Sequence, residues 1–94
     1  MHPPETPYTG PFDFVVSEAA VGQVDGVRFT VAGIREVERG GAVIPTTYLD
    51  IERSRIVDVE PDSVVTLREG LALRVVAIVS AGDPMKGKVY FQRA

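Results

Sequence analysis

The chain has 94 residues, which is enough for one hydrophobic core and too few for two independent domains. Hydrophobic residues make up 45% and charged residues 24%, a balance typical of a globular domain rather than a disordered chain. With 10 basic and 13 acidic residues the net charge is −3. Binding to nucleic acid needs a clustered basic face that displaces counterions, and the basic residues here are interspersed with acidic ones. We therefore expect no nucleic-acid partner.

The residue inventory also excludes several kinds of catalytic site. The chain has no cysteine, so it cannot form a disulfide, a thiolate nucleophile or a cysteine metal site. Its single histidine is His2, near the start of a proline-rich segment, which excludes a positioned histidine base in a nucleophilic triad. No phosphate-binding glycine loop or paired-histidine zinc motif occurs. The inventory favours a non-enzymatic protein with no cofactor and no metal.

The first eleven residues differ from the remainder of the chain. They contain four prolines and almost no apolar side chains, a composition that favours extended and solvated conformations. We therefore predict a flexible leader over 1–11 and a single β domain over 12–94. The start has neither the basic region nor the apolar region of a secretory signal, and no apolar run approaches about 18 residues. These features predict a cytoplasmic protein with no membrane partner.

From residue 12 onward, short apolar runs alternate with turn signals. Asp25-Gly26, Gly40-Gly41 and the segment around Pro61 are typical of tight turns, because their residues tolerate or preset the required φ angles. Pro45 lacks an amide donor, which confines its strand to a sheet edge or a bulge. The expected strands cover 12–16, 21–24, 27–38, 43–53, 56–59, 64–67, 71–80 and 89–93.

Two of these strands repeat one pattern at an offset of 44 residues. Each begins after an acidic residue and a glycine and carries three apolar residues at period two, the period of a strand with one buried face. The predicted inward residues are Val27, Phe29 and Val31 in the first copy and Leu71, Leu73 and Val75 in the second. Val76 and Ile78 have the opposite parity, which indicates either burial on both faces or a bulge, and Gly33 marks a possible bulge in the first copy.

Together these patterns predict an all-β fold, either a small antiparallel β-sandwich or a closed barrel of about seven to eight short strands. If the repeat is a true duplication, each copy is a three-stranded meander and the two halves pack about a pseudo-twofold axis. Any two hairpins in a meander can also share such a pattern by chance. Both interpretations remain open at this point.

The first candidate site lies on one strand, where Tyr48, Asp50 and Glu52 share the outward parity. Two carboxylates close together can separate their pKa values for acid–base chemistry or can bind a hard cation. The alternative is a solvated outer face that prevents edge strands from aggregating. Tyr90 has outward parity on the last strand, and exposed aromatic residues are enriched at interfaces.

The second candidate site is the loop 81–88, because loops on rigid β scaffolds often carry binding function. It holds the only lysines of the chain, Lys86 and Lys88, together with Met85. A connection without any binding role is the alternative.

One pair of segments resembles a known group of proteins. The segment Leu67-Arg68-Glu69-Gly70-Leu71-Ala72-Leu73-Arg74-Val75, followed by Gly87-Lys88-Val89-Tyr90-Phe91-Gln92-Arg93, is similar to the C-terminal half of short actinobacterial all-β proteins of unknown function. The resemblance covers about half of the chain. It implies a compact β domain from a bacterial cytoplasm and assigns no catalytic residue.

Two functional hypotheses follow. The first is a non-enzymatic interaction module that binds another protein or a second copy of itself in a homodimer. The second is a β-barrel that binds a small molecule, or an accessory biosynthetic enzyme that uses carboxylates, and it requires a cavity lined by Asp50, Glu52 or Tyr48.

Overall fold

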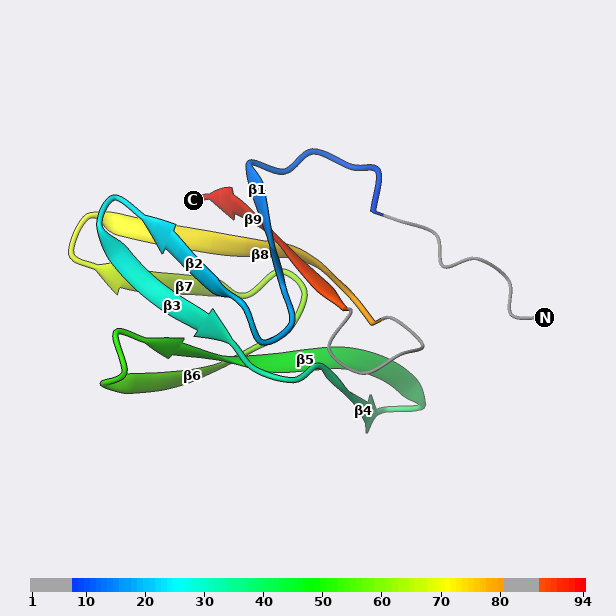
Figure 1. Cartoon of the computed structure of the whole chain (residues 1–94). Helices are drawn as coiled ribbons and strands as arrows, with labels where there is room; N and C mark the ends of the chain where they lie inside the picture. Colours follow the sequence, from blue (N-terminus) through cyan, green and yellow to red (C-terminus); the bar gives the residue numbers. More distant parts are fainter. Residues whose placement is uncertain (1–7, 81–86) are drawn as a thin grey trace.

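The structure is a computed structural model that describes residues 8–80 and 87–94. Within these two ranges the chain forms nine strands and no helix (Figure 1). The strands are β1 Phe14–Ser17, β2 Val21–Val24, β3 Val27–Val31, β4 Arg35–Arg39, β5 Ala42–Ile51, β6 Arg55–Val59, β7 Val64–Arg68, β8 Leu71–Val79 and β9 Lys88–Arg93. The all-β prediction is confirmed, and the count exceeds the expected seven to eight because the predicted strand 27–38 divides into β3 and β4.

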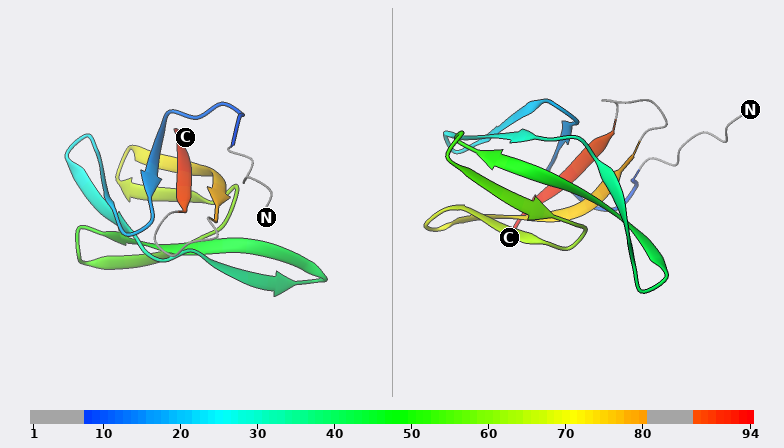
Figure 2. Two further views of the ribbon diagram at one scale, coloured as in Figure 1. Left: turned by 45° about the vertical axis from the view of Figure 1, so that its right-hand side comes forward. Right: turned by 90° about the horizontal axis from the view of Figure 1, so that it is seen from below.

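The strands form two antiparallel sheets that pack face to face (Figures 1 and 2). The first sheet has the order β1-β9-β8-β7, and the second has the order β2-β3-β5-β4 with β6 also paired to β5. Among the strands described, no ladder joins β1 to β2 or β6 to β7, so the sheets stay separate at both sides. The fold is a small β-sandwich, and the closed-barrel alternative is wrong.

A side chain occupies one of the two open sides. Arg55 on β6 donates from Nη2 to the carbonyl oxygen of Thr66 at 2.6 Å and to that of Leu67 at 3.3 Å, both on β7. The carbonyl groups at this edge of β7 therefore accept hydrogen bonds from a guanidinium group instead of from the backbone of another strand. This contact shields an edge strand that would otherwise be open to pairing.

The inward faces of both sheets form one core. All six inward residues predicted from the repeat are buried, with exposed fractions between 0% and 7%. Phe29 of the second sheet meets Phe91 of the first edge to face at a centroid distance of 5.3 Å, and Phe14 stacks on Phe91 at 5.3 Å. Because such contacts fill the space between the sheets, the core is built of side chains from both.

Of the alternatives left open for the two repeat copies, the structure shows an irregular register in each. In β8 the register shifts between Val75 and Ala77, so Val76 is an extra residue and Ile78 returns to the inward face. In the first copy, Val31 pairs with Leu49 and Arg35 with Thr46, so three residues, 32–34, lie opposite two. The strand break therefore contains Gly33, as the sequence indicates. Whether the two copies arose by duplication stays a prediction.

Side chains satisfy the backbone groups that the break at 32–34 leaves without ladder partners. The carboxylate of Glu18 accepts the N–H of Ile34 at 2.9 Å and the N–H of Gly87 at 2.8 Å. The hydroxyl of Thr47 donates to the carbonyl of Ala32 at 2.9 Å. Glu18 thereby joins the β1–β2 turn, the break and the start of β9.

An ion pair connects the two sheets. The guanidinium of Arg93, at the end of β9, donates to both carboxylate oxygens of Asp25 in the β2–β3 turn, at 3.0 and 3.1 Å. This hydrogen-bonded pair lowers the pKa of Asp25 below its ordinary value and raises the pKa of Arg93. The backbone N–H of Arg93 donates to Asp13 at 2.7 Å, so the last strand is tied to two other segments.

A two-stranded arm extends from the second sheet (Figure 2). Residues 47–51 of β5 pair with β6, whereas residues 42–46 pair with β4 alone. Gly40 and Gly41, with φ of 60° and 83°, form the two-residue turn at the tip, as predicted. We call residues 35–46 the arm. Pro45 lies inside β5 opposite Glu36 rather than at a strand start.

Candidate functional site

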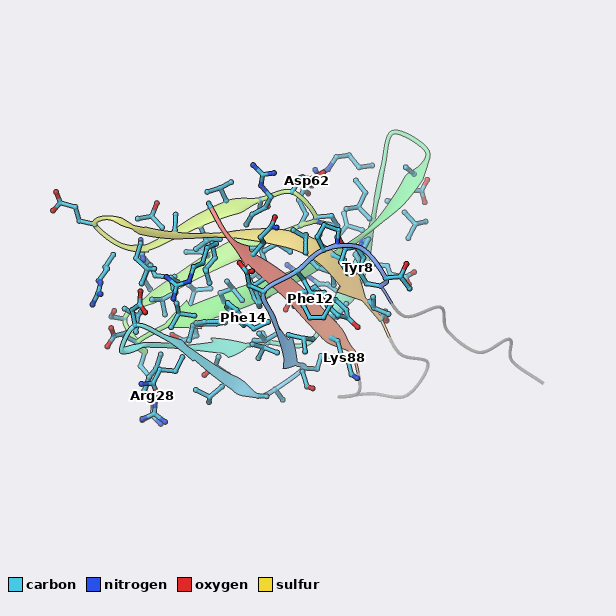
Figure 3. The ribbon with its side chains drawn as sticks, turned by 90° about the horizontal axis from the view of Figure 1, so that it is seen from above. Tyr8, Phe12, Phe14, Arg28, Asp62 and Lys88 are labelled. Carbon is cyan, nitrogen blue, oxygen red and sulfur yellow. The ribbon has the colours of Figure 1, made fainter. Side chains whose placement is uncertain are left out.

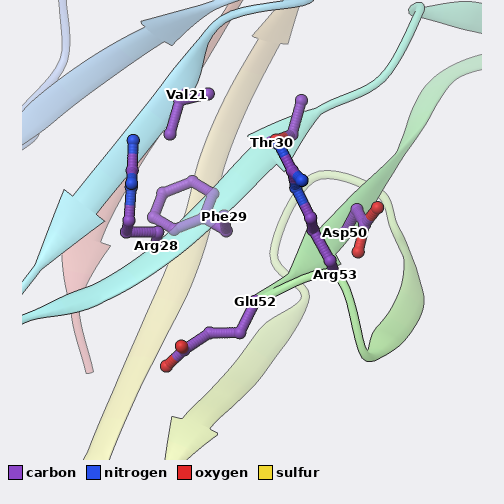
Figure 4. A pocket seen from close by; sticks show the side chains of 7 residues that line it. All are labelled: Val21, Arg28, Phe29, Thr30, Asp50, Glu52 and Arg53. Carbon is purple, nitrogen blue, oxygen red and sulfur yellow. The ribbon is translucent and has the colours of Figure 1, made fainter.

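Asp50 and Glu52 both line an open hollow on the outer face of the second sheet, and their carboxylates point in different directions (Figure 4). The hollow has a volume of about 350 Å³. Its lining residues are Val21, Arg28, Phe29, Thr30, Asp50, Glu52 and Arg53. It is open to solvent, so its charged groups stay hydrated, and a pair of unit charges at 4 Å in water attracts by only about 1 kcal/mol. The second functional hypothesis required an enclosed cavity, and these carboxylates line a surface hollow instead.

The turn beside this hollow has an unusual backbone. Glu52 and Arg53 have φ of 53° and 57°, the left-handed region that favours glycine and asparagine. Ile51 and Arg55 pair across the turn, and Ser54 donates its N–H to the carbonyl of Ile51 at 3.0 Å. The sequence has no glycine at this hairpin, so it gives no signal for a tight turn there. The expected strand 43–53 therefore extends two residues too far, since β5 ends at Ile51.

Tyr48 lies on the same face as Asp50 but does not line the hollow. The guanidinium carbon of Arg35 lies 4.3 Å from the centroid of the Tyr48 ring. Such a cation–π contact contributes on the order of 0.5–1 kcal/mol at a partly exposed site. Tyr48 therefore packs against Arg35, the first residue of the arm, and does not belong to the site formed by Asp50 and Glu52.

Tyr90 has the predicted outward parity, yet it is only 7% exposed. Tyr8 and Phe12 cover it, with centroid distances of 5.1 and 4.9 Å to its ring. Figure 3 shows both residues over β9, on the outer face of the first sheet. The expectation of an exposed Tyr90 is wrong, because aromatic residues from the N-terminal segment cover the ring. Phe12 itself lies on this outer face and is 42% exposed.

Of the second candidate site, the loop 81–88, the structure describes only residues 87 and 88. Met85 and Lys86 lie outside the described residues. Lys88 is exposed at the first position of β9, where it pairs with Ser17 and Val79. Of the predicted site residues that can be placed, Asp50 and Glu52 line the hollow, Tyr48 lies beside them on β5, Lys88 is on another sheet, and Tyr90 is buried.

A surface along one face of the arm was not predicted from the sequence. A groove of about 370 Å³ lies between the arm and the end of β6. Its lining residues are Arg35, Val37, Arg39, Thr46, Asp58, Val59, Glu60 and Ser63. Arg39 crosses it to form an ion pair with Glu60 at 2.8 Å, and both side chains are substantially exposed. Such an exposed pair contributes little stability, commonly about 0–1 kcal/mol.

The arm exposes most of its residues. Of residues 35–46 only Thr46 is buried, and Val43 is 61% exposed. One face carries Arg35, Val37 and Arg39, and the other carries Glu36 and Glu38, because neighbouring side chains on a strand point to opposite faces. The sequence signal for this arrangement is the charge alternation Arg-Glu-Val-Glu-Arg directly before Gly40-Gly41.

Two further properties concern the described part of the chain. No group of three or more histidine, aspartate or glutamate side chains suited to hold a metal ion occurs in residues 8–80 and 87–94. In the same residues, no helix is long and apolar enough to span a membrane.

Within residues 8–80 and 87–94, the arm with the groove beside it and the hollow are surface features whose side chains can contact another molecule. The chain matches no protein-family model, no curated protein and no solved structure. The resemblance to short actinobacterial all-β proteins stays a prediction.

Proposed function

We propose that this chain is a non-enzymatic protein-interaction module and that the arm, residues 35–46, is its contact element. The observation that carries the proposal is that the arm extends beyond the sandwich as two strands with most of their residues exposed. A two-stranded ribbon is marginally stable in water on its own. Fixing each residue costs about 1–2 kcal/mol of backbone entropy, and Val37, Val43 and Ile44 stay at least partly exposed, so they repay little of that cost. A bound partner would bury them.

The partner can be another protein or a second copy of the chain, and the protein is expected to act in the cytoplasm of a bacterium. Edge strands and exposed apolar side chains are features through which β domains associate. Light scattering at protein concentrations up to about 1 mM distinguishes the two kinds of partner. A concentration-dependent rise in mass identifies self-association, and a constant monomer mass directs the search to another protein.

A shortened-arm variant tests the proposal. In this variant residues 36–45 are replaced by Asn-Gly, which forms a two-residue turn between Arg35 and Thr46, themselves already paired. The core residues are all retained, so we expect the circular dichroism spectrum to keep its β form. The binding partner is first identified by cross-linking in a bacterial extract, and its affinity is then measured with the purified partner.

We expect the shortened arm to weaken binding of the purified partner by at least about a hundredfold, because the contact element is removed. Val43→Lys keeps the arm, because the new cation lies opposite Glu38, and it adds a charge at an exposed position, so it should weaken binding by a smaller factor. Val64→Glu is the matched control, since Val64 is 56% exposed on β7. Equal affinity of the full chain and the shortened variant would overturn the proposal.

A second candidate function is the binding of a small zwitterion at the hollow on the second sheet. It is favoured by one observation: Asp50 and Glu52 line the hollow together with Arg28 and Arg53, so both charge signs are present. Titration of the ¹⁵N-labelled protein with free arginine and free glutamate tests it. Saturable shifts at residues 28, 50 and 53 below about 10 mM ligand would support it, and linear shifts across the surface would contradict it.

A further inference from the structure

The free edge of β4 is the part of the arm with a defined recognition pattern. β4 pairs with β5 on one side, and on its other side no strand among the described residues forms a ladder with it. Figure 2 shows this edge at the outside of the arm. Four of its five residues are exposed. An exposed strand edge offers unpaired N–H and C=O groups to an incoming strand.

The pairing of Pro45 indicates which backbone groups this edge presents. Pro45 lies opposite Glu36, and because proline has no N–H, these two residues cannot exchange a pair of hydrogen bonds. In an antiparallel ladder the residues of such a pair direct their N–H and C=O away from each other. The N–H and C=O groups of Glu36, and by parity those of Glu38, therefore point to the free edge of β4.

The opposite edge of the arm is less suited to an added strand. By the same parity, Val43 and Pro45 direct their backbone groups away from β4, on the side of β5 that β6 does not reach. Only Val43 supplies an N–H there, since proline has none. β4 is thus the edge of the arm that can accept a strand.

A second copy of the chain is a poor occupant of this edge. Pairing two β4 strands antiparallel through their outward groups sets Glu36 against Glu38, Glu36 against itself, or Glu38 against itself, depending on the register. Each of these registers places a glutamate directly opposite a glutamate. Like charges directly opposite one another destabilise a strand pair. The palindromic order of residues 35–39 therefore protects the edge from self-pairing.

We propose that β4 binds an extended segment of another protein with the alternation acidic–basic–apolar–basic–acidic. Basic side chains of that segment face Glu36 and Glu38, an apolar one faces Val37, and acidic ones face Arg35 and Arg39. Backbone hydrogen bonds to Glu36 and Glu38 supply affinity, and the charge pairs supply specificity. This inference rests on the proposed function of the arm, and it names the partner class.

Two capped peptides of equal composition test the inference on the unmodified protein. The complementary peptide has the core Glu-Lys-Val-Lys-Glu, and the reference peptide has the core Lys-Glu-Val-Glu-Lys. We expect the complementary peptide to bind about tenfold more tightly at low ionic strength, because four attractive cross-strand pairs replace four repulsive ones. The largest ¹⁵N chemical-shift changes should fall on residues 35–39. The preference should decrease as salt is added.

Two variants locate the interaction. With Glu36→Lys and Glu38→Lys together, each peptide makes attractive and repulsive pairs in equal number, so the preference should fall to less than about twofold. Glu38→Pro removes an outward N–H while leaving the groups directed to β5, so it should abolish binding of the complementary peptide. Equal binding of both peptides by the unmodified protein, no binding of either at 1 mM, or shift changes at another strand would overturn the inference.

The outcomes separate this inference from the proposed function. If the shortened arm loses its purified partner but the two peptides bind equally, the arm is the contact element and the strand pattern is wrong. If the shortened arm binds that partner as well as the full chain, the arm has no such role. A β4-dependent dimer in light scattering, abolished by Glu38→Pro, would also overturn the partner class proposed here.

Discussion

Glu18 and Gly87, which are 69 residues apart in the sequence, are joined by two hydrogen bonds. The backbone N–H of Glu18 donates to the carbonyl of Gly87 at 2.8 Å, and the N–H of Gly87 donates to the Glu18 carboxylate at 2.8 Å. The other carboxylate oxygen accepts the N–H of Ile34. One side chain thus fixes the start of β9 and the strand break from which the arm departs.

Removal of the Glu18 carboxylate should destabilise the protein measurably. Glu18→Ala leaves the N–H groups of Ile34 and Gly87 without their acceptor, and an unsatisfied, partly buried donor costs about 1–3 kcal/mol. We expect the free energy of unfolding in urea to fall by about 1.5–3 kcal/mol, with faster hydrogen exchange at both amides. Glu69→Ala, in the exposed β7–β8 turn, is the control. A loss below about 0.5 kcal/mol would show that water replaces the carboxylate.

Gly87 should not tolerate a side chain. A Cβ atom there would lie 2.5 Å from Cδ1 of Ile34, 2.6 Å from Oε1 of Glu18 and 2.9 Å from the carbonyl oxygen of Val79. Because the last of these is backbone, Gly87→Ala should cost about 1–3 kcal/mol of unfolding free energy. Gly33→Ala is the matched control, since its Cβ would meet only Glu18 Oε2, at 3.7 Å. Equal stability of the two variants would contradict the packing around Gly87.

The two central core residues should each contribute strongly to stability. Phe29 and Leu73 are 1% and 0% exposed, on the second and first sheets respectively. Truncation of a buried large side chain to alanine costs roughly 2–5 kcal/mol, a large part of the total for a domain of this size. Urea unfolding of Phe29→Ala and Leu73→Ala measures this cost, with Val64→Ala as an exposed control. Losses below about 1 kcal/mol would mean that these strand faces are not inward.

The pH dependence of stability should include the pair formed by Asp25 and Arg93. Their hydrogen bonds lower the pKa of Asp25 in the folded protein. A carboxylate whose folded pKa is lowered stabilises the protein above its unfolded pKa, about 3.9, and this stability is lost as the pH falls through the folded pKa.

Urea unfolding between pH 7 and pH 2.5 measures this contribution. The native chain should exceed Asp25→Asn in stability at neutral pH, and the difference should shrink as the pH falls below the unfolded pKa. Glu69→Gln, at the aligned position of the other hairpin, is expected to follow the native chain. A difference that stayed constant with pH would contradict the role of the ion pair.

The β5–β6 turn should be improved by residues that favour positive φ. Glu52 and Arg53 adopt left-handed conformations, which cost side-chain-bearing residues roughly 1–2 kcal/mol each, less the entropy that glycine adds to the unfolded chain. The double variant Glu52→Asn, Arg53→Gly matches the preferred turn sequence. We expect its unfolding free energy to rise by about 0.5–2 kcal/mol. A decrease would indicate that the native Glu52 and Arg53 side chains themselves stabilise the turn.

Local patterns in the sequence were sufficient for most of the strands and turns, although the expected strand 27–38 is divided into β3 and β4. Period-two apolar spacing identified the inward faces of β3, β8 and β9, because alternation along a strand is a local property. The glycines at 26, 40 and 70 marked turns for the same reason, since positive φ is a requirement of single residues. The parity change after Val75 indicated either burial on both faces or a bulge, and the pairing with β9 shows the bulge, at Val76.

Tertiary structure decided what lies against each face. Parity placed Tyr90 outward, but only the folded chain brings Tyr8 and Phe12 over it. The sandwich, rather than a barrel, depends on which strands meet at the open sides, where Arg55 reaches β7. The arm arises because β5 is longer than β6, a comparison between pairing partners that single-strand periodicity does not contain. Strand faces follow from local sterics, whereas coverage, edges and grooves follow from long-range pairing.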